Sequence, residues 1–162
     1  MSTYALGQFR DAAASWERVR SMEEAFEPVY FDLIDAYLQL KEQDRALRTA
    51  RTALERWPQD AELFEALGVV QTVRGSIDDA IKSFQAAVAI APADPTGYFN
   101  LAKAMEMRYF RSRRYVSQLR KWVTNDADRQ TAIEHYERYL ALNGPYADAA
   151  RAGLTRLNWV PK

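Results

Sequence analysis

The chain has 162 residues and carries 22 basic and 22 acidic side chains, so its formal net charge is zero. This length suits one compact domain or a short array of repeating units. With no cysteine and a single histidine, the sequence excludes disulfides, thiolate metal sites and a histidine cluster for zinc, and we expect no metal and no cofactor.

The two halves of the chain differ in charge. Residues 1–94 hold 16 Asp and Glu against 10 Lys and Arg, a net charge of −6, whereas residues 95–162 hold 6 against 12, a net charge of +6. We therefore expect an electrically dipolar molecule. The N-terminus lacks a basic start followed by an apolar run, and no window approaches 18 uncharged apolar residues. These features predict a soluble, cytoplasmic protein, or a periplasmic one if an upstream segment is missing.

A period of 34 residues runs through the first two thirds of the sequence. The positions that repeat at this spacing are Ala12, Ala46 and Ala80; Tyr30, Phe64 and Tyr98; Leu33, Leu67 and Leu101; and Pro58 and Pro92. Between them the apolar residues follow a helical period, which Gly75 and Pro92 interrupt. The pattern predicts two helices in every repeat.

These residues resemble the tetratricopeptide repeat family. Residues 61–94 read Phe64-x-x-Leu67-Gly68-x-x-Gln71, then Ala80-x-x-x-Phe84 and Pro92, and residues 27–60 follow the same scheme from Tyr30 to Pro58. The resemblance implies an all-α fold, a right-handed superhelical solenoid of antiparallel helix pairs. It also implies a non-catalytic scaffold or adaptor that binds a peptide or partner helix in a concave groove.

In chain order, we expect a single domain over residues 1–162. Its units are a partial repeat at 1–26, repeats at 27–60 and 61–94, an enlarged repeat at 95–145, and a capping helix with its tail at 146–162. A helix without an upstream partner would leave Trp16 and Val19 partly uncovered. The chain is therefore expected to be a piece of a longer array or to pair with another copy through its N-terminal repeat.

The enlarged repeat contains 18 additional residues, because Ala132 follows Ala80 by 52 positions. The apolar residues keep a helical phase through Tyr109, Val116, Leu119 and Val123. We therefore predict that the first helix of this repeat overshoots its partner, with these apolar side chains packed and the cations projecting.

Candidate catalytic residues are absent from the sequence, which has no glycine-rich phosphate loop and no hydrolase motif. We expect no enzymatic activity. The resemblance instead places groove-lining positions on the first helix of each repeat, and the candidate binding residues are Phe31, Asp35, Leu38, Glu62, Glu65, Val69, Val73, Phe99, Lys103 and Met107.

This predicted groove is apolar and acidic, which bears on its partner. Family members that grip a C-terminal carboxylate use lysine, arginine and asparagine, whereas Asp35 and Glu65 stand at such positions here. Like charges at an interface are costly. We therefore expect a protein or peptide partner with apolar anchors and a neutral to basic charge.

The added segment is rich in cations and aromatic residues. Its candidate binding residues are Arg108, Arg111, Arg113, Arg114, Arg120 and Lys121. This composition suits three kinds of binding partner: an acidic protein, a nucleic acid or an anionic membrane surface. It also suits a solvated helix face that pairs with the acidic half of the chain and binds no partner. Of the three binding partners, the acidic protein is favoured, because no nucleic-acid motif surrounds the segment and its apolar residues can equally pack inside the protein.

Overall fold

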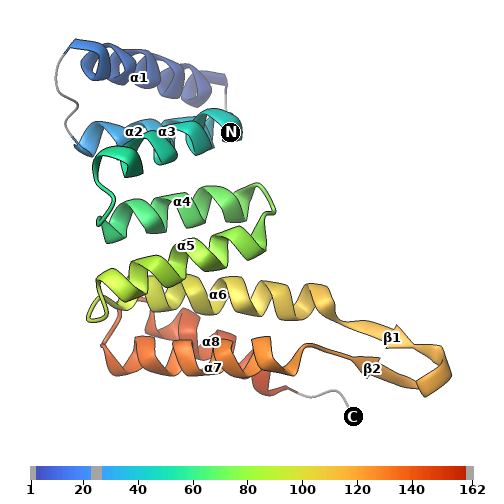
Figure 1. The fold of residues 1–162 in the computed structure, drawn as a ribbon. Helices are drawn as coiled ribbons and strands as arrows, with labels where there is room; N and C mark the ends of the chain where they lie inside the picture. The colour runs from blue at the N-terminus through green and yellow to red at the C-terminus, as the bar shows by residue number, and fades with distance from the viewer. Residues whose placement is uncertain (1–2, 23–26, 160–162) are drawn as a thin grey trace.

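The computed structural model describes residues 3–22 and 27–159, which form a stack of antiparallel helices (Figure 1). The helices are α1 (Thr3–Met22), α2 (Glu27–Gln39), α3 (Gln43–Arg56), α4 (Ala61–Val73), α5 (Ile77–Ile90), α6 (Pro95–Ser112), α7 (Asp126–Ala141) and α8 (Ala147–Asn158). Each helix packs on the next, and contacts also join α2 to α4, α4 to α6 and α6 to α8. These four helices therefore form one layer of an all-α solenoid, as the sequence predicts.

Local sequence signals fix where the helices begin. The Asp60 carboxylate accepts a hydrogen bond from the Leu63 amide at 2.7 Å at the start of α4, and Asp94 accepts one from the Thr96 amide at 2.8 Å at the start of α6. Pro95 occupies the first turn of α6, where its missing amide proton costs nothing. These residues satisfy amides that would otherwise lack partners.

Small residues set the close approach of the helices. Ala46, Ala80 and Ala132 are fully buried. At Gly68 in α4, an added Cβ would run into the ring of Phe84 in α5. The glycine of this repeat thus allows an aromatic ring of the second helix to pack directly on the backbone of the first.

Helix α1 packs on α2 at the N-terminal end of the stack. Ala13 is buried, and Trp16 packs half-buried on the same apolar cluster. The Tyr37 hydroxyl on α2 donates a hydrogen bond to Glu17. Val19 is 43% exposed and Met22 79% exposed, so this outer surface carries uncovered apolar groups, and its pairing with another copy stays a prediction.

The inserted segment corrects our prediction of an overshooting helix. Helix α6 ends at Ser112, and the chain then forms an antiparallel hairpin of β1 (Arg114–Val116) and β2 (Lys121–Val123). A short 3₁₀ turn, η1 (Ser117–Leu119), joins the strands and is followed by Arg120 in the left-handed region at φ 51°. Figure 1 shows this hairpin, which we call the hairpin arm (residues 113–124), projecting beyond the ends of α6 and α7.

The physical reason lies in the residue types. Each strand consists of a cation, an aromatic residue and a valine, and aromatic and β-branched residues favour strands. A helix here would bring several arginines together with no acidic residue one turn away. Leu119, expected to pack, is 57% exposed, and Val116 is only half-buried. Tyr109 does pack against the core.

The last helix is joined to the stack by an ionic network around one buried carboxylate, although the Arg156 side chain is half exposed. The Glu106 carboxylate on α6 is 6% exposed. It accepts a hydrogen bond from Arg156 Nε on α8 at 2.6 Å and one from the Tyr136 hydroxyl on α7 at 2.6 Å. Three helices therefore meet at one carboxylate.

None of the helices among the described residues is both long enough and apolar enough to cross a membrane.

Candidate interaction surfaces

The predicted groove residues lie on α2, α4 and α6, and we call this surface the α2–α4–α6 face. Val69 and Val73 lie one turn apart on α4 and are 38% and 51% exposed. Phe31 and Leu38 on α2 are half-buried, because their inner edges pack on the neighbouring apolar clusters. Contiguous exposed apolar groups, more than apolar residues exposed singly, indicate binding sites.

Acidic side chains accompany these apolar groups. Asp35 on α2 and Glu62 on α4 are exposed, and Glu65 is half-buried against α6. A Cβ built at Gly97 would lie 3.3 Å from the Glu65 carboxylate, which shows how closely the two helices approach there. Burial, with smaller contributions from Asp94 and Glu62, raises the pKa of Glu65 to about 7.

This raised pKa predicts a pH-dependent stability. The folded state binds the Glu65 proton more tightly than the unfolded state, so the free energy of unfolding falls as pH rises from about 4.5 to about 7. We expect Glu65→Gln to be more stable than the wild type at pH 8 by about 1–2 kcal/mol, after allowance for solvent screening. At pH 4.5 the two should be nearly equal. Urea unfolding across this range measures the difference, and an unchanged pH slope in the variant would show that another group is responsible.

The C-terminal part of the face is less open than the sequence suggests. The Phe99 ring packs on Tyr139 at 5.0 Å between centroids and on Tyr146 at 5.8 Å. Lys103 lies over the same ring at 6.0 Å. Met107 instead lines a shallow cleft of about 400 Å³ together with Lys103. Phe99 is therefore mainly a packing residue, while Lys103 and Met107 remain available.

Arg108, predicted as a binding residue of the added segment, lies in the last turns of α6 and pairs with acidic residues of the same molecule. Its guanidinium donates to the buried Asp128 carboxylate at 2.8 Å from Nε and 2.6 Å from Nη2. Its Nη1 donates to Asp78 on α5 at 2.7 Å. These partners hold the pKa of Arg108 above its usual value, so we do not retain Arg108 among the proposed partner contacts.

Of the other predicted cations, Arg111 and Arg113 also contact the protein. Arg111 Nη1 donates to the Gly75 carbonyl at 3.3 Å. The Arg113 guanidinium lies 5.7 Å from the Phe110 ring centre and 5.5 Å from that of Trp122. Arg114, Arg120 and Lys121 are exposed on the hairpin arm.

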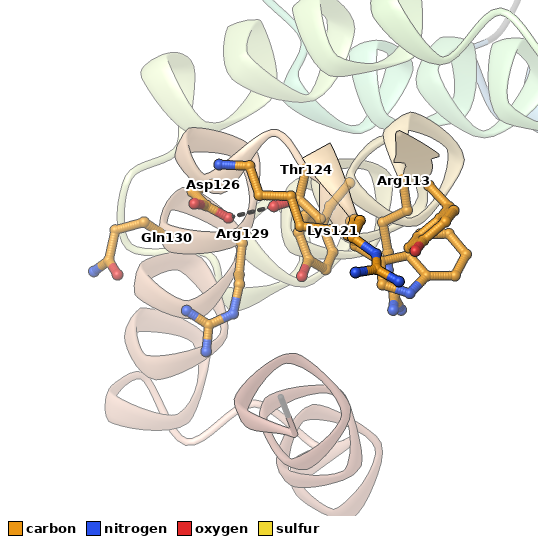
Figure 2. A pocket seen from close by; sticks show the side chains of 10 residues that line it. Arg113, Lys121, Thr124, Asp126, Arg129 and Gln130 are labelled. Atoms are coloured by element: carbon orange, nitrogen blue, oxygen red, sulfur yellow. Dashed lines mark hydrogen bonds between the residues drawn. The ribbon is translucent and has the colours of Figure 1, made fainter. Parts of the chain in front are cut away.

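The hairpin arm and the start of α7 enclose a cleft of about 890 Å³, shown in Figure 2. Four cations line it, which are Arg113, Arg120, Lys121 and Arg129, together with one acid, Asp126. Arg129 uses Nε to donate to the Leu157 carbonyl at 2.6 Å. The cleft therefore combines positive charge with aromatic surface.

The candidate binding residues predicted from the sequence did not include Tyr115 and Trp122, two aromatic residues that line this cleft. Tyr115 and Trp122 are cross-strand partners with ring centres 5.7 Å apart, and each is 55% exposed. The same order of cation, aromatic residue and valine occurs on both sides of Ser117, and this similarity could have indicated them. Arg129 lies outside the insert, and only the fold brings it to the cleft.

The family model described as tetratricopeptide repeat matches residues 2–60 and 31–95, which together span more than half of the chain. The chain belongs to the tetratricopeptide repeat family. Among curated proteins, no sequence matches it. Proteins of this family generally serve as non-catalytic scaffolds for protein interaction, and that is the general function which membership supports. Among residues 3–22 and 27–159, no group of three potential metal ligands comes together.

Solved tetratricopeptide repeat structures share this fold. A crystal structure of MamA has 18% identity and a TM-score of 0.66, and the match covers 86% of this chain and 71% of that one. MamA from Desulfovibrio magneticus RS-1 has 18% identity and a TM-score of 0.65, with 86% and 69% covered. YrrB, described as a TPR protein with an unusual peptide-binding site, has 15% identity and a TM-score of 0.67, with 92% and 68% covered. At these identities, the likeness concerns the fold alone.

Proposed function

We propose that this tetratricopeptide repeat protein is an adaptor that holds a peptide or a partner helix on its α2–α4–α6 face. The observation that carries the proposal is the pair of uncovered valines on α4, Val69 and Val73, at 38% and 51% exposure. They are four residues apart and so lie on the same side of α4, and a partner helix packs on side chains with this spacing. Phe31 and Leu38 extend the apolar stripe onto α2.

The charges of the face select the partner. Asp35 and Glu62 are exposed beside the valines, and Glu65 adds a negative charge above about pH 7. A terminal carboxylate would meet repulsion here, whereas lysine or arginine beside an apolar anchor would be attracted. The proposed ligand is therefore an internal segment with apolar anchors and a neutral to basic charge. Affinity for one short segment would be micromolar, about 8 kcal/mol.

A selection from a displayed library of random 15-residue peptides tests the proposal. We expect the enriched peptides to combine aliphatic or aromatic residues with Lys or Arg and to bind independently of a free C-terminus. Enrichment of acidic peptides, or of peptides that need their C-terminal carboxylate, would contradict the proposed chemistry.

A paired substitution then tests the location. Val69→Glu with Val73→Glu should weaken the selected peptides by about tenfold or more, because it replaces apolar contact by buried charge. Stability should change little, since both side chains are exposed. The matched control is Gln85→Glu with Ala89→Glu, which has the same spacing at exposed positions of α5. Calorimetric titration measures both, and equal losses in the two proteins would remove the face from consideration.

A further inference from the structure

The hairpin arm carries large apolar groups that the described part of the chain leaves exposed. Tyr115, Leu119 and Trp122 are each 55–57% exposed. Strands β1 and β2 form a sheet of two strands, and such a ribbon is marginally stable in water without further packing. Contact with a partner would therefore stabilise the arm as well as cover its aromatic residues.

The charge of the arm is entirely positive. Residues 113–124 contain Arg113, Arg114, Arg120 and Lys121 and no acidic residue. The arm thus presents aromatic and aliphatic anchors flanked by cations. This is the same chemistry that the α2–α4–α6 face is proposed to bind.

The complementary surface lies in the other half of the same sequence. Residues 1–94 carry a net charge of −6 and residues 95–162 a net charge of +6. Asp35 on α2 and Glu62 on α4 are exposed, and so are Val69 and Val73 on α4. Asp35 makes one side-chain hydrogen bond, from Gln39 at 3.2 Å, so its charge is not neutralised there.

The arm and this surface cannot meet within one molecule in the observed arrangement. Figure 1 shows the arm leaving the stack from α6 and α7 and pointing away from it, while α2 and α4 lie in the other half. Helix α5 follows α4 in the stack and packs on both α4 and α6. Any pairing of arm with face must therefore join two copies.

We propose that the hairpin arm of one copy docks on the α2–α4 part of the α2–α4–α6 face of a second copy. The proposal rests on the proposed function, because it assigns an occupant to the same face. Donor and acceptor surfaces differ, so the contact is head-to-tail and leaves a free arm at one end and a free face at the other. Such contacts build open chains, or rings where the rotation closes.

Sedimentation equilibrium of the intact protein tests the pairing. In about 50 mM salt, the weight-average mass of the wild type should rise with concentration, and about 500 mM salt should reduce the association because exposed charges are then screened. Two variants are compared with the wild type: the arm variant, Arg114→Glu with Lys121→Glu, and the face variant, Asp35→Lys with Glu62→Lys. Each should associate at least about tenfold more weakly than the wild type. All four side chains are exposed, so the helical stack should remain folded, which circular dichroism checks.

The decisive sample is a mixture of the two variants. The arm variant still has a native face and the face variant still has a native arm, so the mixture should form a one-to-one dimer that neither forms alone. Arg51→Glu with Glu137→Lys, at exposed positions of α3 and α7, is the matched control and should associate like the wild type.

Three results would overturn the pairing. The first is a wild-type protein that stays monomeric in low salt. This result would leave the proposed function open to its own test, the peptide selection. The second is association that persists in both variants, which would place the contact on another surface, such as the exposed side of α1. A monomeric protein that binds anionic vesicles or an oligonucleotide in low salt, with binding lost in the arm variant, would assign the arm to an anionic surface instead.

Discussion

Replacing Arg108 by alanine is expected to lower the free energy of unfolding by about 2–4 kcal/mol. The Asp128 carboxylate is 4% exposed and receives two hydrogen bonds from Arg108. Its other side-chain donor is Asn125 Nδ2 at 2.8 Å. Removal of the guanidinium would leave a buried charge with one amide partner, which is costly, although the partial exposure of Arg108 moderates the loss.

The matched control for this prediction is Arg114→Ala. Arg114 is exposed on the hairpin arm, so its loss should change stability by no more than about 0.5 kcal/mol. Urea unfolding followed by circular dichroism measures both variants. Equal, small effects would show that the contacts between Arg108 and Asp128 contribute little to the folded state.

The second large effect is expected for Glu106→Ala, which should lower the free energy of unfolding by about 2–4 kcal/mol, because the Arg156 side chain that loses its partner is half exposed. The change removes the carboxylate that Arg156 and Tyr136 share at 2.6 Å each, and it leaves the buried Tyr136 hydroxyl without that acceptor. It also opens a cavity between α6, α7 and α8. Hydrogen exchange should show α8 opening before the rest of the stack, since this network joins α8 to α6.

Two companion variants separate the contributions. Tyr136→Phe removes one hydroxyl and should cost about 1 kcal/mol. Glu137→Ala alters an exposed glutamate on α7 and should be nearly neutral. A Glu106→Ala protein as stable as the Glu137→Ala protein would contradict the assigned role of the network.

The repeat architecture could be predicted because its determinants are local and periodic. Ala46 and Ala80 recur at 34 residues where helices must approach closely, and both are fully buried. Asp60 and Asp94 also recur at this spacing and cap α4 and α6. Each unit packs mainly on its neighbours, so a one-dimensional pattern is enough to specify the fold.

The hairpin arm could not be predicted from helical phase alone. Tyr109, Val116, Leu119 and Val123 fit one side of a helix, yet the same stretch contains two short runs of aromatic and β-branched residues that also suit strands. Short apolar runs often suit both periods. The left-handed backbone of Arg120, which completes the turn, has no glycine or asparagine to mark it.

The candidate binding surfaces were only partly accessible to sequence reasoning. The acidic and apolar character of α2 and α4 follows from helix positions. The covering of Phe99 does not, because Tyr139 and Tyr146 reach it from α7 and the following loop. Likewise, Arg108 meets Asp78 and Asp128, 30 and 20 residues away in sequence, only once the helices have packed.

The footprint of a selected peptide on the protein's amide ¹⁵N–¹H correlation spectrum tests the proposed binding face most directly. At concentrations where the protein is monomeric, we expect the shifts to gather on α2 and α4, around Leu38, Val69 and Val73, and to extend to Met107 on α6. The amides of the α3 and α5 surface that faces away should be unaffected. Shifts confined to that surface, or to the hairpin arm and the start of α7, would contradict binding on the α2–α4–α6 face.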